Sequence, residues 1–469
     1  MKGLRLNVRS GLVVILCLTL MVCLFGCTNK TEDTTGSDTS QEKADSSNAD
    51  PSEDSEASEA SFNATQVLEI RGFDWGPAVT KTVIHLDKEL TKENIDKENF
   101  TVKERKQGIG SLTSFERKVL NAYLSDDKGN KTEGNSDHLT LELSYSPDEG
   151  SPFRFNLATF MNEWAPVYQL EITLKEGKKL SDTEGNEYLL KVDPETDVQK
   201  ALFPELENAA TDGVFKGSAH ELTYASFVPD NASEDHKRPL VIWLHGMGEG
   251  GKDPKIAVLG NRVTKLFSEE FQKAMKGCYV LVPQTETYWM QYAENGSWAD
   301  NKGQDSIYLK DLKELIDQYV SDNYIDPDKI IIGGCSNGGF MTMDMLFNYP
   351  EMFAGAYPIC EAYASSGITE DMVNNIKDIP MWITYAKNDT TVSPASFEEP
   401  LIDMLEKAGA KDLHISVFED VHDTSGEFKT VSGAAYQYQG HWSWIYFFNN
   451  ECTGGDLKIW DWMSGLVNG

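Results

Sequence analysis

Residues 333–339, with the sequence GGCSNGG, hold the residue types that nucleophilic catalysis requires. They follow an apolar, β-branched run typical of a buried strand, and residues 340–346 then show the apolar spacing of a helix. The pattern is the G-x-S-x-G nucleophile elbow, a strained turn that presents a serine hydroxyl above a sheet. We expect glycine at 334 and 338 because a side chain there would collide where helix and strand backbones pass closely. The sequence therefore predicts Ser336 as a nucleophile.

Acyl transfer at a serine also needs hydrogen-bond donors for the negative charge that develops on the substrate oxygen. The predicted helix start supplies one donor, the backbone N–H of Asn337. Residues 245–248 read HGMG and follow a predicted buried strand, which is the place of the second donor in such sites. We assign that donor to the backbone N–H of Met247, and we expect the side chain of His245 to brace the loop.

A carboxylate and an imidazole would complete a triad. Asp389 begins the loop after the predicted strand at 380–386, where its carboxylate would orient an imidazole and stabilise the imidazolium. Three histidines follow it: His414 lies inside a predicted strand, His422 lies just past that strand's end, and His441 precedes the last predicted helix. We favour His441 as the base, with His422 as the alternative. The neighbouring Asp423 would pair with His422, and residues 423–440 would be an insertion folded over the cleft.

Three further side chains are candidate substrate contacts. Trp298 belongs to an aromatic loop after the strand at 278–283, which would either stack on a sugar or an aromatic acyl group or cover the core. Glu361 follows another strand and would either bind substrate alcohol groups or satisfy loop amides. Trp444 lies beside the predicted base and would shield the site.

The elements that must position these residues lie in a domain at 195–452. Strands there alternate with helices, which predicts a mostly parallel sheet whose ligands bind beyond the carboxyl ends of the strands. The order is that of an α/β-hydrolase. The expected strands are 239–244, 278–283, 330–332, 353–357, 380–386 and 413–418, and the expected helices are 305–320, 340–346, 394–407 and 442–450.

A different rhythm, of short alternating runs between turns, covers residues 64–194 and predicts an all-β sandwich of immunoglobulin type. This span contains no cysteine and no cluster of ionisable groups that suggests chemistry, so we expect an accessory domain. The expected strands are 67–70, 82–86, 100–102, 119–124, 139–143, 168–174 and 188–192.

Four motifs together carry a family resemblance: GGCSNGGFMTM at the elbow, KNDTTV at the acid loop, GHWSW at the base loop and GFDWGP at residues 72–77. They resemble bacterial carboxylesterases with an immunoglobulin-like N-terminal domain, which are relatives of prolyl-oligopeptidase and polyhydroxybutyrate-depolymerase-type hydrolases. The resemblance covers about 64–452 and implies a triad of Ser336, Asp389 and His441. Residues 453–469 have no counterpart in it and are assigned to a C-terminal tail.

The chain begins with the pattern of an exported protein. Residues 1–26 combine a basic start with a short apolar run, which indicates a signal peptide. Cys27 follows in a sequence that resembles a lipobox and would carry the lipid, although Phe25 is bulkier than usual and leaves ordinary secretion or an uncleaved anchor open. Residues 27–63 are acidic and rich in Ser and Thr, which predicts a disordered tether.

The composition argues against some classes of partner and cofactor. The net charge of −33 argues against nucleic acid. The four cysteines that follow Cys27 in the chain, at 278, 335, 360 and 452, are widely spaced and form no zinc-site pattern. We expect no metal and no other cofactor. The resulting hypothesis is a serine carboxylesterase that is lipid-anchored at the outer face of the cytoplasmic membrane and acts on small-molecule or polysaccharide esters. The alternatives are a prolyl-oligopeptidase-like peptidase and a non-catalytic surface carbohydrate-binding protein; the oligomeric state is not predicted.

Overall fold

The computed structural model describes residues 60–299 and 303–469. The predicted signal peptide, Cys27 and nearly all of the predicted tether lie outside the described residues. The described residues belong to one compact unit. Within the described part of the chain, no helix combines the length and the apolar character needed to cross a membrane.

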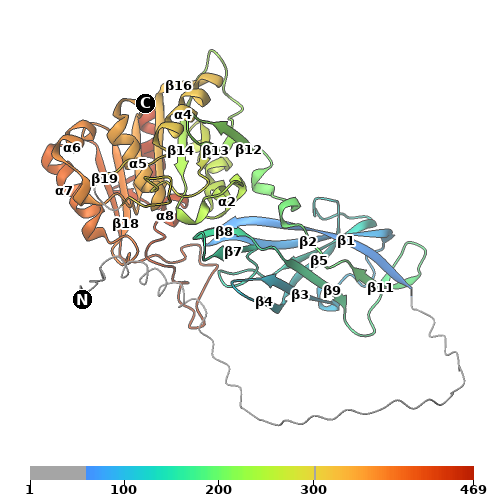
Figure 1. Ribbon diagram of the computed structural model, residues 1–469. Coiled ribbons are helices and arrows are strands. Elements are labelled where there is room, and N and C mark those ends of the chain that lie inside the picture. The colour runs from blue at the N-terminus through green and yellow to red at the C-terminus, as the bar shows by residue number, and fades with distance from the viewer. Residues whose placement is uncertain (1–59, 300–302) are drawn as a thin grey trace, which may run out of the picture. The chain divides into compact units, whose positions relative to one another are not determined.

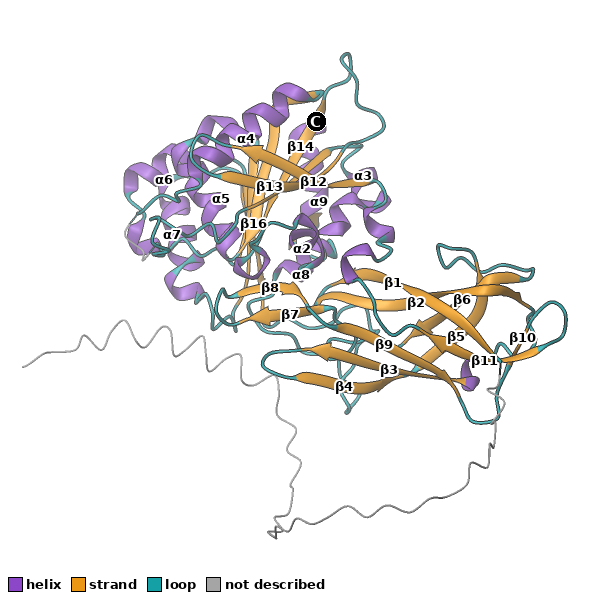
Figure 2. Ribbon diagram, turned by 45° about the vertical axis from the view of Figure 1, so that its right-hand side comes forward, coloured by secondary structure: helices purple, strands orange, loops and turns teal. Residues whose placement is uncertain are grey.

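The first part of this unit is a β-sandwich (Figure 2). A six-stranded sheet has the order β10-β11-β1-β2-β6-β5, a three-stranded sheet has the order β4-β3-β9, and β7 and β8 form a separate hairpin. The strands are β1 (Ser61–Phe73), β2 (Gly76–Leu90), β3 (Phe100–Gln107), β4 (Leu112–Arg117), β5 (Val119–Ser125), β6 (Ser136–Leu143), β7 (Phe153–Asn156), β8 (Met161–Trp164), β9 (Tyr168–Leu174), β10 (Leu180–Ser181) and β11 (Glu187–Val192). The predicted immunoglobulin-like fold is confirmed.

Every one of the seven expected sandwich strands falls within an observed strand. The sequence analysis did not predict β4, β7, β8 and β10. Strand β4 is exposed along nearly all of its length and therefore lacks the alternation of apolar and polar residues that marks a half-buried strand. The other three have two to four residues each, too few to show a period.

The second part is an eight-stranded sheet with the order β12-β13-β15-β14-β16-β17-β18-β19, shown in Figure 1. All pairs from β15 to β19 are parallel. The strands are β12 (Ala209–Lys216), β13 (Glu221–Phe227), β14 (Arg238–Leu244), β15 (Tyr279–Gln284), β16 (Ile325–Cys335), β17 (Gly355–Ile359), β18 (Met381–Ala386) and β19 (Leu413–Phe418). The predicted α/β-hydrolase fold is confirmed. The antiparallel pair β12 and β13 was missed, because its residues were interpreted as a polar connection.

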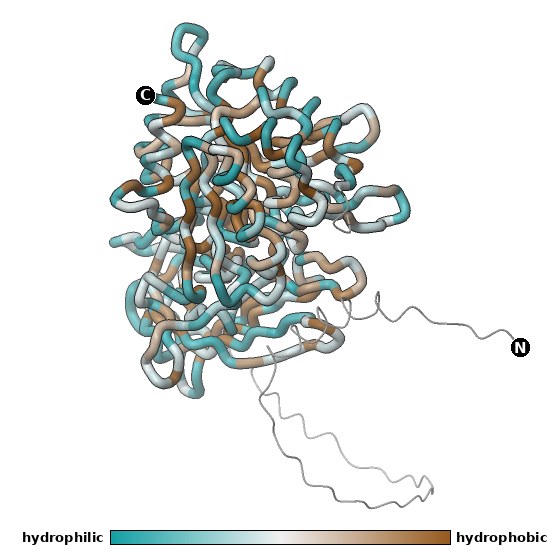
Figure 3. The backbone as a smooth tube through the Cα atoms, turned by 90° about the vertical axis from the view of Figure 1, so that its left-hand side faces the viewer, coloured by the Kyte–Doolittle hydropathy of each residue, from teal (hydrophilic) through white to brown (hydrophobic). Residues whose placement is uncertain are grey.

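Helices cover both faces of this sheet. They are α2 (Pro254–Leu259), α3 (Glu269–Ala274), α4 (Leu309–Asp322), α5 (Asn337–Asn348), α6 (Glu370–Ile376), α7 (Glu398–Ala408), α8 (Trp444–Phe448) and α9 (Ile459–Asn468). Alternate residues of β14 enter two different cores: Ile242 packs with the residues of α4 to α7, and Trp243 packs with those of α2, α3, α8 and α9. Figure 3 shows the hydrophobic segments gathered inside and hydrophilic segments at the outer loops.

The end of the chain belongs to the folded core. Residues 453–469, expected as a tail, form the short strands β20 (Thr453–Gly454) and β21 (Leu457–Lys458) and then helix α9. Ile459, Trp460 and Met463 of this helix are buried in the same core as Trp243. One face of α9 therefore completes the covering of the sheet.

Candidate active site

The elbow concentrates its backbone strain on the predicted nucleophile. Ser336, between β16 and α5, has φ 56° and ψ −116°, a conformation that is rare for a residue with a side chain. Neither flanking glycine has a positive φ. A Cβ at Gly334 would lie 2.3 Å from the carbonyl oxygen of Leu244, and a Cβ at Gly338 would lie 2.0 Å from the same oxygen. Glycine is thus required at both positions mainly because strand β14 passes close to them. The sequence analysis had expected the collision to occur between the strand and the helix of the elbow itself.

Ser336 lies where two parallel strands end side by side. Its backbone N–H donates to the carbonyl oxygen of Ile359, the last residue of β17, over 2.9 Å. Its side chain is half-buried, whereas the residues on both sides are buried. The hydroxyl is therefore carried at the carboxyl-end edge of the sheet, where ligands bind in open α/β folds.

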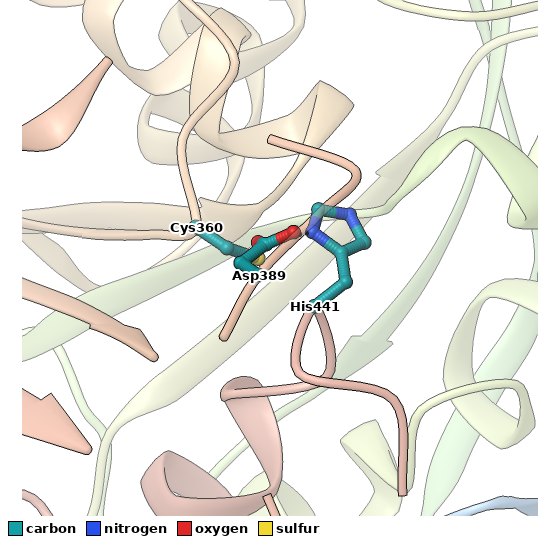
Figure 4. A group of neighbouring side chains, drawn as sticks. All are labelled: Cys360, Asp389 and His441. Atoms are coloured by element: carbon teal, nitrogen blue, oxygen red, sulfur yellow. Dashed lines mark hydrogen bonds and ion pairs between the residues drawn. The ribbon is translucent and has the colours of Figure 1, made fainter. Parts of the chain in front are cut away.

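The structure brings the predicted acid and the favoured base together. Nδ1 of His441 lies 2.7 Å from Oδ2 of Asp389, and Figure 4 shows the imidazole and the carboxylate facing each other from two separate loops. The other carboxylate oxygen accepts from the backbone N–H groups of Thr391 (2.8 Å) and Val392 (2.9 Å). These bonds hold the buried carboxylate in one orientation toward the imidazole. The ring of His441 also packs edge-on against Trp444, with centroids 5.6 Å apart.

A glycine makes this approach of two loops feasible. A Cβ at Gly440 would lie 2.2 Å from Oδ1 of Asn388 and 2.5 Å from its backbone carbonyl oxygen. Real Cβ contacts are essentially never shorter than 3.0 Å. Only glycine therefore lets the loop that carries His441 lie against the loop that carries Asp389.

The alternative base is engaged elsewhere. The side chain of His422 is 44% exposed, and its Nδ1 lies 2.7 Å from Oδ1 of Asp420. The expected pairing with Asp423 is wrong, because that carboxylate accepts from the hydroxyl of Ser425 and the N–H of Gly426. Segment 423–440 packs in part against the sandwich, where the ring of Phe428 meets aromatic residues of the first domain. Its place over the cleft stays a prediction.

The two predicted oxyanion donors lie at the starts of helical segments. Asn337 is the first residue of α5, and Met247 is the first residue of a 3-10 turn (Met247–Glu249) that follows β14. Such positions have backbone N–H groups without a partner inside the helix. His245 braces this loop: Nδ1 donates to the carbonyl oxygen of Gly246 (2.6 Å) and Nε2 accepts from the N–H of Thr285 (3.2 Å). Burial lowers the pKa of His245 to about 4, so its imidazole is neutral.

One cysteine approaches the imidazole and carboxylate. Sγ of Cys360 and ligand atoms of Asp389 and His441 lie within 4.8 Å of one another, and no other such set occurs within residues 60–299 and 303–469. Burial raises the pKa of the Cys360 thiol well above its usual value, so it is a neutral thiol and a weak metal ligand. Because the imidazole and the carboxylate already bond to each other, the set fits an acid–base pair better than a metal centre. The absence of metal and cofactor stays a prediction.

Of the three candidate substrate contacts, only Trp298 is open to solvent. It is 40% exposed and packs on Tyr288 with ring centroids 5.1 Å apart. Glu361 is completely buried and accepts from the N–H of Tyr363 over 2.6 Å, which matches its alternative role of satisfying loop amides. Trp444 is buried against His441. Burial raises the pKa of Glu361 to about 8.

Sequence reasoning missed two buried carboxyl groups near the site. Glu398 begins α7 and is completely buried; burial, and then the neighbouring Glu361, raise its pKa well above the usual value. Glu249 lies in the predicted oxyanion loop and is also buried. A glutamate is normally a surface residue, so neither position carried a signal except that Glu249 stands among glycines in HGMGEGG.

Comparisons with known proteins give similar families for both parts of the chain. Residues 63–189 match the family model described as "Esterase Ig-like N-terminal domain", and residues 231–430 match the one described as "Phospholipase/Carboxylesterase". The chain is 28% identical over 223 residues to "Poly(3-hydroxyalkanoate) depolymerase C" of Paucimonas lemoignei, covering 40% of this chain and 49% of that protein. It is 25% identical over 174 residues to "Probable carboxylesterase SOBER1-like" of Arabidopsis thaliana, covering 33% of this chain and 62% of that protein. The chain thus spans about half to two thirds of the length of these curated relatives.

A solved structure extends the likeness to both domains. The crystal structure of a thermostable esterase aligns with a TM-score of 0.64 at 24% identity, covering 83% of this chain and 96% of that one. At this level of identity the alignment shows that the two chains share a fold.

Proposed function

We propose that this chain, an α/β-hydrolase of the phospholipase/carboxylesterase family with an esterase immunoglobulin-like N-terminal domain, is a serine carboxylesterase. The observation that carries the proposal is the 2.7 Å contact between His441 Nδ1 and Asp389 Oδ2 at the sheet edge that also presents the strained Ser336. A serine nucleophile, a histidine base and a carboxylate that orients the base are the parts of a hydrolytic triad.

The hydrogen bond between His441 and Asp389 decides which ring nitrogen of His441 can act as the base. Nδ1 of His441 is held by Asp389, so Nε2 is the nitrogen that accepts the proton of Ser336 as its Oγ attacks the ester carbonyl. The N–H groups of Met247 and Asn337 would stabilise the oxyanion. His441 then returns the proton to the leaving alcohol, which leaves an acyl-enzyme on Ser336. Water then attacks the acyl carbon while the same imidazole takes its proton. The bond between the acyl carbon and Oγ of Ser336 breaks, His441 returns the proton to Oγ, and the acid leaves.

The direct test replaces the nucleophile. Ser336→Ala should abolish hydrolysis of p-nitrophenyl acetate while the far-UV circular dichroism spectrum and the melting temperature stay those of the wild type. A fluorophosphonate probe should label the wild type at Ser336 and leave the variant unlabelled. Wild-type turnover by folded Ser336→Ala would contradict the proposal.

We propose small-molecule or polysaccharide-linked esters as substrates. The exposed Trp298, packed on Tyr288, offers an aromatic surface for a sugar or an aromatic acyl group. A panel of short acyl, acetyl-xylan and hydroxycinnamoyl esters tests this, together with prolyl peptides. Equal kcat/KM for simple acyl esters and for carbohydrate esters would refute the proposed preference for carbohydrate-linked esters. A preference for prolyl peptides would identify the enzyme as a peptidase.

We further propose that the enzyme is anchored outside the cell through Cys27. The support is the leader pattern of residues 1–26 followed by the acidic segment 27–63, which would hold the folded unit away from the membrane. In an expressing bacterium the protein should partition into the detergent phase of Triton X-114, and Cys27→Ser should move it to the aqueous phase. Aqueous partition of the unaltered protein would refute anchoring.

A further inference from the structure

We propose that the immunoglobulin-like domain supplies a positioning residue, Asn162, which holds the oxyanion loop at residues 246–250 in place through the side chain of Glu249. The inference rests on the serine-esterase function proposed above. It gives the N-terminal domain, expected from sequence to be an accessory, a direct part in supporting the site.

The contact joins the β7–β8 hairpin of the sandwich to the loop after β14. Nδ2 of Asn162, on β8, donates to Oε1 of Glu249 over 3.2 Å. Even a methyl group at Gly248, next to the predicted donor Met247, would lie 3.0 Å from the same nitrogen. The side chain of Asn162 therefore bonds to Glu249 and leaves little room for a side chain at Gly248. Figure 2 shows the hairpin on the side of the sandwich that faces the catalytic domain.

The catalytic domain holds the other side of Glu249. Nδ2 of Asn261 donates to Oε2 of Glu249 over 3.2 Å. Nε2 of Gln284 donates to the backbone carbonyl oxygen of Glu249 over 2.9 Å. Each carboxylate oxygen thus has one amide donor, from Asn162 on one side and Asn261 on the other. At Gly250 the loop lies directly against the segment that follows β15, because a Cβ at Gly250 would lie 1.9 Å from the carbonyl oxygen of Thr287.

The hairpin that carries Asn162 is itself firmly attached. Nε1 of Trp164, two residues along β8, donates to Oδ2 of Asp253 over 2.7 Å, and Asp253 caps helix α2. The ring of Trp164 packs edge-on against Phe153 of β7, with centroids 4.7 Å apart. At a separate part of the domain contact, the hydroxyl of Tyr145 donates to Oε1 of Glu427 over 3.0 Å. Asn162 therefore lies on a hairpin that is bonded to the catalytic domain.

Loss of this contact should displace the oxyanion donor. Glu249 is buried, and burial raises its pKa to about 7, while the amides of Asn261 and Asn162 oppose that rise. Without Asn162, one oxygen of a buried carboxyl loses its donor, and such a group moves toward water or another partner. Movement of Glu249 carries Met247 with it, because both belong to one 3-10 turn. Oxyanion donors act over about 2.7–3.1 Å, so a small shift reduces stabilisation of the transition state.

The test compares two substitutions at Asn162 with a control at Tyr145 in the full-length protein. Asn162→Ala removes the donor, and the isosteric Asn162→Asp replaces it with a carboxylate, which accepts hydrogen bonds but does not donate them. Tyr145→Phe removes a hydrogen bond of the domain contact that involves neither the oxyanion loop nor Asn261. For each variant, kcat and KM for p-nitrophenyl acetate are normalised to the sites titrated by a fluorophosphonate, so that misfolded protein does not count. The affinity for a trifluoromethyl ketone, whose adduct with serine places an oxyanion in the hole, is measured in parallel.

We expect Asn162→Ala to lower kcat about tenfold with little change in KM, a fraction of the roughly 10²–10³ that loss of a whole oxyanion donor costs. The ketone should bind more weakly by a similar factor, Asn162→Asp should lose more than Asn162→Ala, and Tyr145→Phe should keep wild-type values. Wild-type kcat and ketone affinity in both Asn162 variants would overturn the inference, as would an equal loss in Tyr145→Phe. Activity in Ser336→Ala would instead refute the proposed function, so the two failures are distinguishable.

Discussion

Gly440 offers a sharp test of how the two loops of the site are held together. A methyl group at this position would meet Asn388 at two atoms, the side-chain Oδ1 at 2.2 Å and the backbone carbonyl oxygen at 2.5 Å. The side chain of Asn388 can rotate away, but its backbone carbonyl belongs to the loop that carries Asp389. Gly440→Ala must therefore separate the loop of His441 from the loop of Asp389.

The size of the separation follows from the contact distances. The Cβ must retreat from 2.5 Å to at least 3.0 Å from the carbonyl oxygen, a shift of 0.5 Å. Transmitted to the next residue, that shift would stretch the 2.7 Å contact between His441 and Asp389 to about 3.2 Å, the outer limit of an N–H···O hydrogen bond. Since misplacement by about 1 Å can cost 10²-fold in rate, we expect kcat to fall by roughly 10- to 100-fold. Overpacking should also destabilise the fold by about 1–3 kcal/mol.

The assay measures kcat on p-nitrophenyl acetate per titrated site, together with the free energy of unfolding in urea. Gly465→Ala is the matched control, because a Cβ at Gly465 on helix α9 meets nothing within 4 Å. The double variant Gly440→Ala/Asn388→Ala removes the side-chain contact but keeps the backbone contact, so it should stay impaired. If Gly440→Ala retains more than half of the wild-type kcat, the reasoning from loop separation is wrong.

Three further predictions concern single side chains. His441→Ala should lose nearly as much kcat as Ser336→Ala because triad members act as a unit, whereas His422→Ala should keep most activity; the reverse order would identify His422 as the base. The pKa of Glu361 is raised by burial from 4.5 to about 8, so the stability that its neutral form contributes is full below pH 4.5 and is lost as the pH rises through 8. Urea unfolding of Glu361→Gln should therefore depend less steeply on pH between 5 and 8 than unfolding of the wild type, and parallel profiles would contradict the assignment. Trp298→Ala should raise KM for hydroxycinnamoyl or sugar esters more than for p-nitrophenyl acetate, and equal effects on both would argue against substrate stacking.

The sequence by itself determines the part of the site that depends only on residues adjacent in the chain. The elbow at 333–339 combines a β-branched run, paired glycines and a helical repeat, and each of these is a property of neighbouring residues. The alternation of strands and helices predicts a parallel sheet, and chain order then places Asp389 at the end of the strand after the elbow pair. The fold class could be predicted because hydrophobic periodicity reflects local geometry. Strands β7, β8 and β10 escaped prediction because a period cannot be seen in two to four residues.

Only the tertiary structure decides which distant residues meet. The pairing of His441 with Asp389 depends on how segment 423–440 leaves the sheet and on the close approach at Gly440, neither of which has a local sequence period. The position of Glu361 after a strand was compatible with binding substrate or with satisfying loop amides, and only the packing shows that the side chain is completely buried. The bond from Asn162 to Glu249 joins residues 87 positions apart in two domains. Such contacts arise when whole elements pack to exclude water, and their partners are therefore set by the assembled surfaces rather than by the residues next to them in the chain.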